Sequence, residues 1–217
     1  MKKYLSISIA SILAFTTHGI AKAQLYVTAE VGGVPGVSGA TLETFDEPSP
    51  TILTLAGDAW LLTGFDTEGT PPYFSGSTAA YFGESPTVGF DTSQYVAVNG
   101  GTATLSFSTP QNYFGILIGT IDAANCLTFY DSANNVIGSV LGSDIPGITL
   151  GSGLPTDTSY VSITSTTPFS RVVAANPGDS LEFDDVAYAV VVPEPASSIL
   201  FGAGLCILGL ALRQRFA

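Results

Sequence analysis

Carboxylates are the side chains of this 217-residue chain that could do chemistry, because the usual basic catalytic groups are confined to its ends. The single histidine is His18, and every lysine lies within the first 22 residues. Between residues 24 and 192 the only basic side chain is Arg171. This region therefore cannot form a Ser-His-Asp triad, a Cys-His dyad, a Schiff-base lysine or a zinc site built from histidines.

Paired carboxylates remain as the one common catalytic device, as in glycosidases. The candidates are Asp122, Asp131, Asp179, Glu182, Asp184 and Asp185. A domain this acidic supplies carboxylate pairs by chance, and Asp131 and Asp179 stand in sequences typical of turns. We therefore expect the protein not to be an enzyme.

Some of the same acids suggest a structural calcium site. Asp122 lies in a predicted turn at 121–125, and Asp184 and Asp185 lie late in the last predicted strand. In β-sandwiches such carboxylates can hold Ca²⁺ together with backbone carbonyls, although the chain has no EF-hand loop. The alternative is that they are ordinary turn and strand-end acids. No other cofactor is expected.

The net charge of −12 excludes one large class of partners. A surface this acidic repels phosphate backbones, so we expect no nucleic-acid binding. Arg171 should pair with one of the surrounding carboxylates, and Cys126 should be a small buried thiol within a strand.

Residues 24–192 read as one all-β domain that positions these acids. Residues 102–108 alternate strictly between apolar and polar side chains, as in a strand with one buried face. Short strands separated by Gly, Pro, Ser and Asn predict an antiparallel, jelly-roll-like β-sandwich, with a long loop at 63–86 and a turn at 131–135. The predicted strands are 25–31, 40–45, 51–55, 102–108, 113–119, 126–130, 136–141, 160–164, 171–174 and 181–192.

The first 23 residues have the pattern of a secretory signal peptide. Lys2 and Lys3 form a basic start, a mostly apolar run follows at 4–15, and small residues flank Lys22. This pattern predicts cleavage between Ala23 and Gln24. The apolar run is too short for a transmembrane anchor.

The last 25 residues, 193–217, have three parts. Pro193-Glu194-Pro195 comes first, an uncharged run at 196–212 predicts a single transmembrane helix, and Arg213 and Arg215 would hold its end on the cytoplasmic side. This order resembles the PEP-CTERM sorting signal of Gram-negative bacteria. The resemblance implies an exosortase as partner, a transient anchor in the inner membrane, and cleavage near Pro193-Glu194-Pro195 before transfer to the cell surface.

The domain itself also resembles a recurrent family of exosortase-dependent surface proteins. The matching segments are 69–76, 91–95, 112–115, 119–131 and 181–189. Members commonly have Trp where this chain has Ile118, which weakens the case for an aromatic binding platform on that strand. The resemblance implies a sorting class and a fold without an assigned activity.

Three functions follow from these features. The first is a non-enzymatic cell-surface or matrix protein linked to exopolysaccharide or biofilm. The second is a carbohydrate-binding module, because aromatic rings can stack on sugars, and the third and last is a carboxylate glycosidase. The aromatic candidates for stacking are Trp60, Tyr73, Phe74, Tyr81 and Phe82.

Overall fold

The computed structural model describes residues 24–46, 53–75, 78, 81–82, 89–150, 158–178 and 180–191. Within them the chain is almost entirely β-structure, with one 3-10 turn, η1 (Gly142–Asp144). The all-β prediction is therefore confirmed, and the jelly-roll assignment stays a prediction. The strands are β1 (Leu25–Val31), β2 (Thr41–Glu43), β3 (Leu53–Thr63), β4 (Tyr73–Phe74), β5 (Gly89–Phe90), β6 (Gln94–Ile118), β7 (Cys126–Tyr130), β8 (Val136–Leu141), β9 (Ser159–Ala175) and β10 (Ser180–Ala189).

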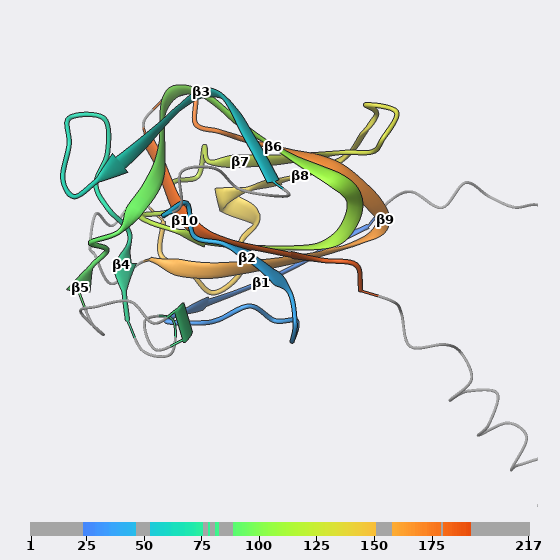
Figure 1. The fold of residues 1–217 in the computed structure, drawn as a ribbon, viewed down its shortest axis with the longest axis horizontal. Helices are drawn as coiled ribbons and strands as arrows, with labels where there is room; N and C mark the ends of the chain where they lie inside the picture. Colours follow the sequence, from blue (N-terminus) through green and yellow to red (C-terminus); the bar gives the residue numbers. More distant parts are fainter. Residues whose placement is uncertain are drawn as a thin grey trace, which may run out of the picture.

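One sheet of eight strands wraps around the core in the order β2-β10-β6-β9-β7-β8, with β1 paired to β9 and β3 paired to β6 (Figure 1). The ladders β1–β9, β3–β6, β6–β9, β7–β8, β7–β9 and β2–β10 are antiparallel, as predicted. β10 pairs with β6 in parallel, which corrects the prediction of a wholly antiparallel sandwich. A separate antiparallel pair, β4–β5, lies at one end of the sandwich.

Two long strands carry the sheet from one layer of the sandwich to the other. β6 pairs with β9 first at 102–106 and again at 113–118, and between these blocks the ladder shifts its register. Figure 1 shows the sharp bend of β6. Two exposed prolines lie in this interruption, Pro110 on β6 and Pro168 on β9. Proline cannot donate to a ladder, so the bend falls where no ladder hydrogen bond is needed.

This bend corrects two sequence predictions. The separate strands expected at 102–108 and 113–119 are one strand of 25 residues, and those expected at 160–164 and 171–174 are one strand of 17 residues. The prolines between them bend the strands without ending them. The predicted loop at 63–86 contains β4, and the predicted turn at 131–135 is confirmed, with Asp131 accepting hydrogen bonds from the backbone of Ala133 and Asn135.

The main core lies between the layers and is rich in phenylalanine. Phe114, Phe129 and Phe169 meet edge to face, with ring centroids 5.1 to 6.4 Å apart, and each is fully buried. Such pairs stabilise a core beyond the area they bury. Truncating any one of these rings to alanine would cost about 3–5 kcal/mol.

A smaller core lies on the outer side of β6 and β9 and includes Tyr113, Leu117, Tyr160 and Phe74. Tyr160 donates a hydrogen bond to the Asp185 carbonyl (3.1 Å), and the Tyr113 hydroxyl accepts one from the Gly36 N–H (2.8 Å). The two tyrosine hydroxyls meet over Gly115, where a Cβ atom would lie 2.6 to 2.8 Å from them. This core fixes β4 against the sandwich, because Phe74 is part of it.

Arg171 does not have the surroundings that the sequence predicted. Its guanidinium carbon lies 3.9 Å from the centroid of the Tyr130 ring, and Nη2 donates to Asn134 Oδ1 (3.1 Å). The contacts described for this cation are thus an aromatic ring and an amide rather than a carboxylate. Stacking replaces an ion pair because β7 and β9 place Tyr130 opposite Arg171 in the ladder.

Several predictions concern residues outside those described. The signal peptide up to Ala23, the motif Pro193-Glu194-Pro195, the apolar run at 196–212, and Arg213 and Arg215 all lie there. Among the residues that are described, none belongs to a helix with the length and apolar character to cross a membrane.

Candidate functional site

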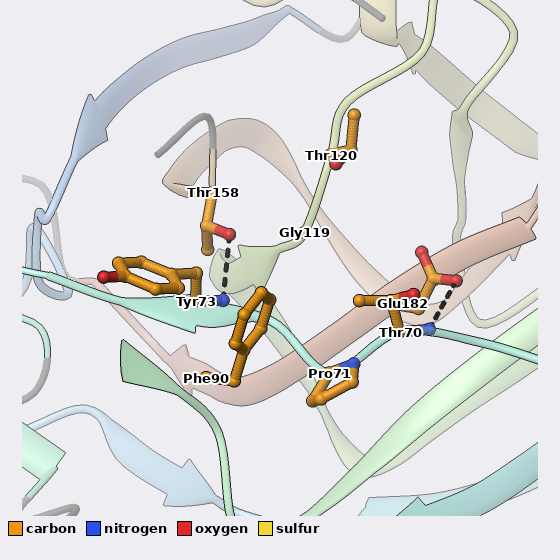
Figure 2. A pocket seen from close by; sticks show the side chains of 8 residues that line it. All are labelled: Thr70, Pro71, Tyr73, Phe90, Gly119, Thr120, Thr158 and Glu182. Carbon is orange, nitrogen blue, oxygen red and sulfur yellow. Dashed lines mark hydrogen bonds between the residues drawn. The ribbon is translucent and has the colours of Figure 1, made fainter. Parts of the chain in front are cut away.

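A small pocket opens where β4 and β5 meet the main sheet. Its volume is about 110 Å³. Its walls come from four parts of the chain: the β4–β5 pair, the end of β6, the start of β9 and the start of β10 (Figure 2). The lining residues are Thr70, Pro71, Tyr73, Phe90, Gly119, Thr120, Thr158 and Glu182.

The apolar wall is formed by Pro71, Tyr73 and Phe90. The rings of Tyr73 and Phe90 are paired across β4 and β5 and meet edge to face, with centroids 5.2 Å apart. Phe65 also packs edge to face on Phe90 (4.8 Å) and is itself 67% exposed. Two edge-to-face neighbours hold the Phe90 ring in one orientation, so this wall is formed before any ligand arrives.

The polar wall is centred on Glu182, whose side chain is only 7% exposed. Its Oε1 accepts hydrogen bonds from the Thr70 N–H (3.3 Å) and the Ser180 hydroxyl. The Gly119 N–H donates to the Glu182 carbonyl (2.9 Å), which fixes the end of β6 against β10. Glu182 therefore presents a carboxylate of fixed orientation to the pocket.

The two side chains of strand β4 point to opposite sides, one toward the core and the other toward the pocket. Phe74 points inward and is 1% exposed, whereas Tyr73, its neighbour, is half-buried at the pocket. The Tyr73 N–H donates to Thr158 Oγ1 (3.0 Å), as Figure 2 shows, and the Asp91 N–H donates to the Pro72 carbonyl (2.8 Å). These bonds hold the β4–β5 pair to the body of the protein.

The turn that precedes the pocket is held by a buried tyrosine. Tyr95 is fully buried, and its hydroxyl donates to the carbonyls of Gly64 (2.9 Å) and Gly69 (3.0 Å). Burial raises the pKa of Tyr95 to about 12, with further contributions from the charges of Glu182, Asp66 and Asp91. The hydroxyl thus stays protonated and keeps both hydrogen bonds.

Two buried carboxyl groups that interact with each other lie close in sequence to residues of the pocket. Asp91 directly follows Phe90, Asp184 lies two residues after Glu182, and they are 2% and 1% exposed. Burial raises the pKa of Asp184 well above its usual value, and the charge of Asp185, the hydrogen bond with Asp91 and the charge of Asp91 raise it further. The interaction of Asp184 with Asp91 links β10 to the residue that follows Phe90.

A bulge in β10 puts Asp184 and its neighbour Asp185 inside the protein. The register of β10 on β6 shifts between Asp184 and Ala187, and Asp185 has a positive φ of 50°. Asp tolerates this left-handed conformation better than most residues. Neither acid is a solvated strand-end residue, which corrects that sequence interpretation for both.

The acids proposed for calcium are not gathered into one group. Asp122 is half-buried in the turn after β6, where its N–H donates to Asn125 Oδ1 (2.6 Å), whereas Asp184 and Asp185 lie inside β10. In the described part of the chain, no three His, Cys, Asp or Glu side chains are placed to hold a metal ion together. The calcium hypothesis is not tested by this arrangement and stays a prediction.

Of the five aromatic residues proposed to stack on sugars, only Tyr73 lines the pocket. Phe74 is in the core, and Trp60 and Tyr81 are exposed elsewhere. Phe90 was missed, because β5 has only two residues and no periodicity to reveal it. Glu182 was named as a candidate carboxylate, but nothing in the sequence places it beside Thr70, 112 residues away.

Residues 191–215 match the PEP-CTERM protein-sorting motif. No curated protein matches the chain. Among solved structures, a family 6 carbohydrate-binding module is 12% identical with a TM-score of 0.38, covering 70% of this chain and 95% of that one. The module CBM6cm-2 from Cellvibrio mixtus lichenase 5A is 12% identical with a TM-score of 0.36, covering 70% and 98%. The module CsCBM6-3 from Clostridium stercorarium is 11% identical with a TM-score of 0.36, covering 71% and 100%. At TM-scores below 0.5, these similarities assign neither a family nor a ligand to this chain.

Proposed function

We propose that this chain is a non-enzymatic cell-surface or matrix protein that an exosortase sorts and processes. The observation that carries the proposal is the PEP-CTERM motif at 191–215. In this proposal the signal peptide directs export across the inner membrane, and the apolar run at 196–212 anchors the chain there transiently. The exosortase then cuts near Pro193-Glu194-Pro195, and the domain passes to the surface, associated with exopolysaccharide or biofilm.

The end of the folded domain supports this order of events. β10 ends at Ala189, and Asn112 binds the backbone of Val191 twice, through Nδ2 to the carbonyl (2.6 Å) and through Oδ1 to the N–H (2.5 Å). The last backbone contact described for the domain therefore lies just ahead of Pro193. A cut beyond Pro193 would release the domain without removing any strand.

The test is the intact mass of protein released from the cell surface. We expect a chain that begins at Gln24 and lacks the apolar segment beyond Pro195. A released form that still contains Phe216 and Ala217 would contradict processing by an exosortase. The matched control is the same strain without the exosortase gene, in which the tail should be retained.

Carbohydrate binding is a second candidate function, and the pocket beside β4 and β5 favours it. The pocket combines an apolar wall of Tyr73, Phe90 and Pro71 with a carboxylate and hydroxyl groups. A sugar ring is complementary to both walls, because its C–H faces can pack on the apolar wall and its hydroxyl groups can form hydrogen bonds with the polar wall. A glycan array probed with the full chain in detergent tests this function. Binding to no glycan on the array would refute it.

The pocket does not support the third candidate, a carboxylate glycosidase. Such enzymes use two carboxyl groups on either side of the scissile bond. Among the described residues that line the pocket, Glu182 is the only acid, and Asp184 is buried and does not line it. We therefore propose binding without catalysis, and a screen with chromogenic glycosides should give no turnover.

A further inference from the structure

The pocket has two chemically different walls, and their arrangement narrows the choice of ligand. Figure 2 shows Phe90 and Pro71 on one side and Glu182, Thr120 and Thr158 around the others. We propose that this pocket is a subsite for a single neutral pyranose ring. The proposal rests on the carbohydrate-binding function above and names the ligand of that site.

The apolar wall suits the C–H face of a sugar ring. The Phe90 ring is held by edge-to-face contacts with Phe65 and Tyr73, with centroid distances of 4.8 and 5.2 Å. A ring that is already held loses little conformational entropy when a ligand stacks on it. Pro71 adds a second rigid surface, because its side chain has no rotamers to lose.

The polar wall suits the hydroxyl edge of the same ring. Glu182 can accept hydrogen bonds from sugar hydroxyls, and its orientation is fixed by Thr70 and Ser180. The hydroxyls of Thr120 and Thr158 can donate or accept. The second carboxylate oxygen of Glu182, Oε2, lies 3.9 Å from the position that a Cβ atom on Gly119 would occupy. Oε2 is therefore close to the part of the pocket wall that Gly119 forms.

The size of the pocket limits the ligand to one ring. Pockets for drug-sized ligands have volumes of roughly 300–1,000 Å³. The volume here is about 110 Å³. A second sugar of a chain would therefore lie outside, over the exposed Phe65.

The charge around the pocket selects neutral sugars. Glu182 lies in the wall, and none of the described residues that line the pocket is basic. A uronic acid would bring a second carboxylate close to Glu182. We expect its affinity to be lower by about tenfold or more, since like charges a few Å apart in a partly enclosed site repel strongly.

The pocket lies away from the end of β10 that precedes the sorting motif. Glu182 stands near the start of β10, and the motif follows the other end of this strand (Figure 1). Seven residues of strand at ~3.3 Å each place Glu182 about 20 Å from Ala189. A sugar could therefore bind while the chain is still anchored by its tail.

The experiment measures binding of methyl glycosides to the full chain in detergent, by ligand-detected NMR and titration. The probes are methyl glucoside, galactoside and mannoside, with methyl glucuronide as the charged comparison. The blocking variant is Gly119→Ala, because its methyl group meets Glu182 at 3.5 Å or more without strain. The control is Gly178→Ala, a glycine with nothing within 4 Å of an added Cβ and no positive φ.

We expect at least one neutral glycoside to bind, Gly119→Ala to weaken it by about tenfold or more, and Gly178→Ala to leave it unchanged. Equal melting temperatures of the two variants would show that the loss is local. Glucuronide binding as tightly as the neutral sugars, or binding unaffected by Gly119→Ala, would overturn the subsite. If the glycan array is positive while Gly119→Ala binds normally, the subsite proposal fails and carbohydrate binding stands elsewhere on the domain. If no glycan or glycoside binds, both fail.

Discussion

Replacing Asp184 by asparagine should make the protein more stable at neutral pH, although the residue is 1% exposed and polar. In the folded protein burial, the neighbouring Asp185 and the pairing with Asp91 keep this carboxyl protonated, because they raise its pKa well above 3.8. Asparagine keeps a hydrogen-bond donor for Asp91 and has no proton to lose. The variant therefore preserves the pairing and removes the cost of keeping an acid neutral.

The direction of the pH dependence of stability follows from the number of protons bound in the folded and unfolded states. Above its unfolded pKa of 3.8, Asp184 is ionised in the unfolded chain and protonated in the folded one. The folded state then binds one more proton, so the free energy of unfolding falls by about 1.4 kcal/mol for each pH unit, until the folded pKa is reached. This stability is fully present below the unfolded pKa and is lost as pH rises through the folded pKa. Each loss of about 1.4 kcal/mol corresponds to ~3–6 °C in melting temperature for a domain of this size.

Thermal unfolding of the wild type and Asp184→Asn between pH 5 and pH 7 provides the assay. We expect the stability difference to change in favour of the variant as pH rises, by up to about 1.4 kcal/mol per pH unit. Asp58→Asn, which removes one exposed negative charge, controls for the change in net charge. Parallel curves for wild type and Asp184→Asn would refute a protonated Asp184, since both states would then lose the proton together.

Three further predictions concern stability. Arg171→Gln should lower the free energy of unfolding by about 1 kcal/mol in chemical denaturation, because it removes the stacking on Tyr130; no change would mean that the stacking contributes nothing. Gly115→Ala should cost about 1–3 kcal/mol in the same assay, because the added methyl would lie 2.6 Å from the Tyr160 hydroxyl, and a neutral result would show that the small core yields easily. If Asp122 and its predicted partners hold calcium, saturation at a hundred times the dissociation constant should add about 2.7 kcal/mol, and a melting curve unchanged by EGTA would exclude the site.

Part of the fold could be predicted from the sequence because its signals are local. Alternation at 102–108 predicted a strand, and Asp131 with Asn134 and Asn135 predicted the turn between β7 and β8. The exclusion of histidine and lysine chemistry needed only the position of those residues. The sorting motif was also readable, because the order of its three parts is a property of the chain and not of its folding.

The length of β6 and β9 could not be predicted in the same way. Pro110 and Pro168 would normally separate strands, and here each lies in the gap where the β6–β9 ladder shifts its register. Only the pairing of both strands shows that the two prolines coincide at one bend. The partner of Arg171 was predicted wrongly for a related reason, since charge alone favoured a carboxylate and strand register supplied Tyr130.

The sequence by itself therefore determined the class of the protein: an acidic β domain ahead of a sorting motif, without the groups for most common catalysis. The tertiary structure decided where its chemistry lies. Asp91 and Asp184 are 93 residues apart in the sequence, and Phe90 and Glu182 are 92 apart. Asp91 nevertheless interacts with Asp184, and Phe90 lines the same pocket as Glu182. Local patterns carry no information on such contacts, because they arise only when the bent strands close the sandwich and the bulge in β10 turns Asp184 inward.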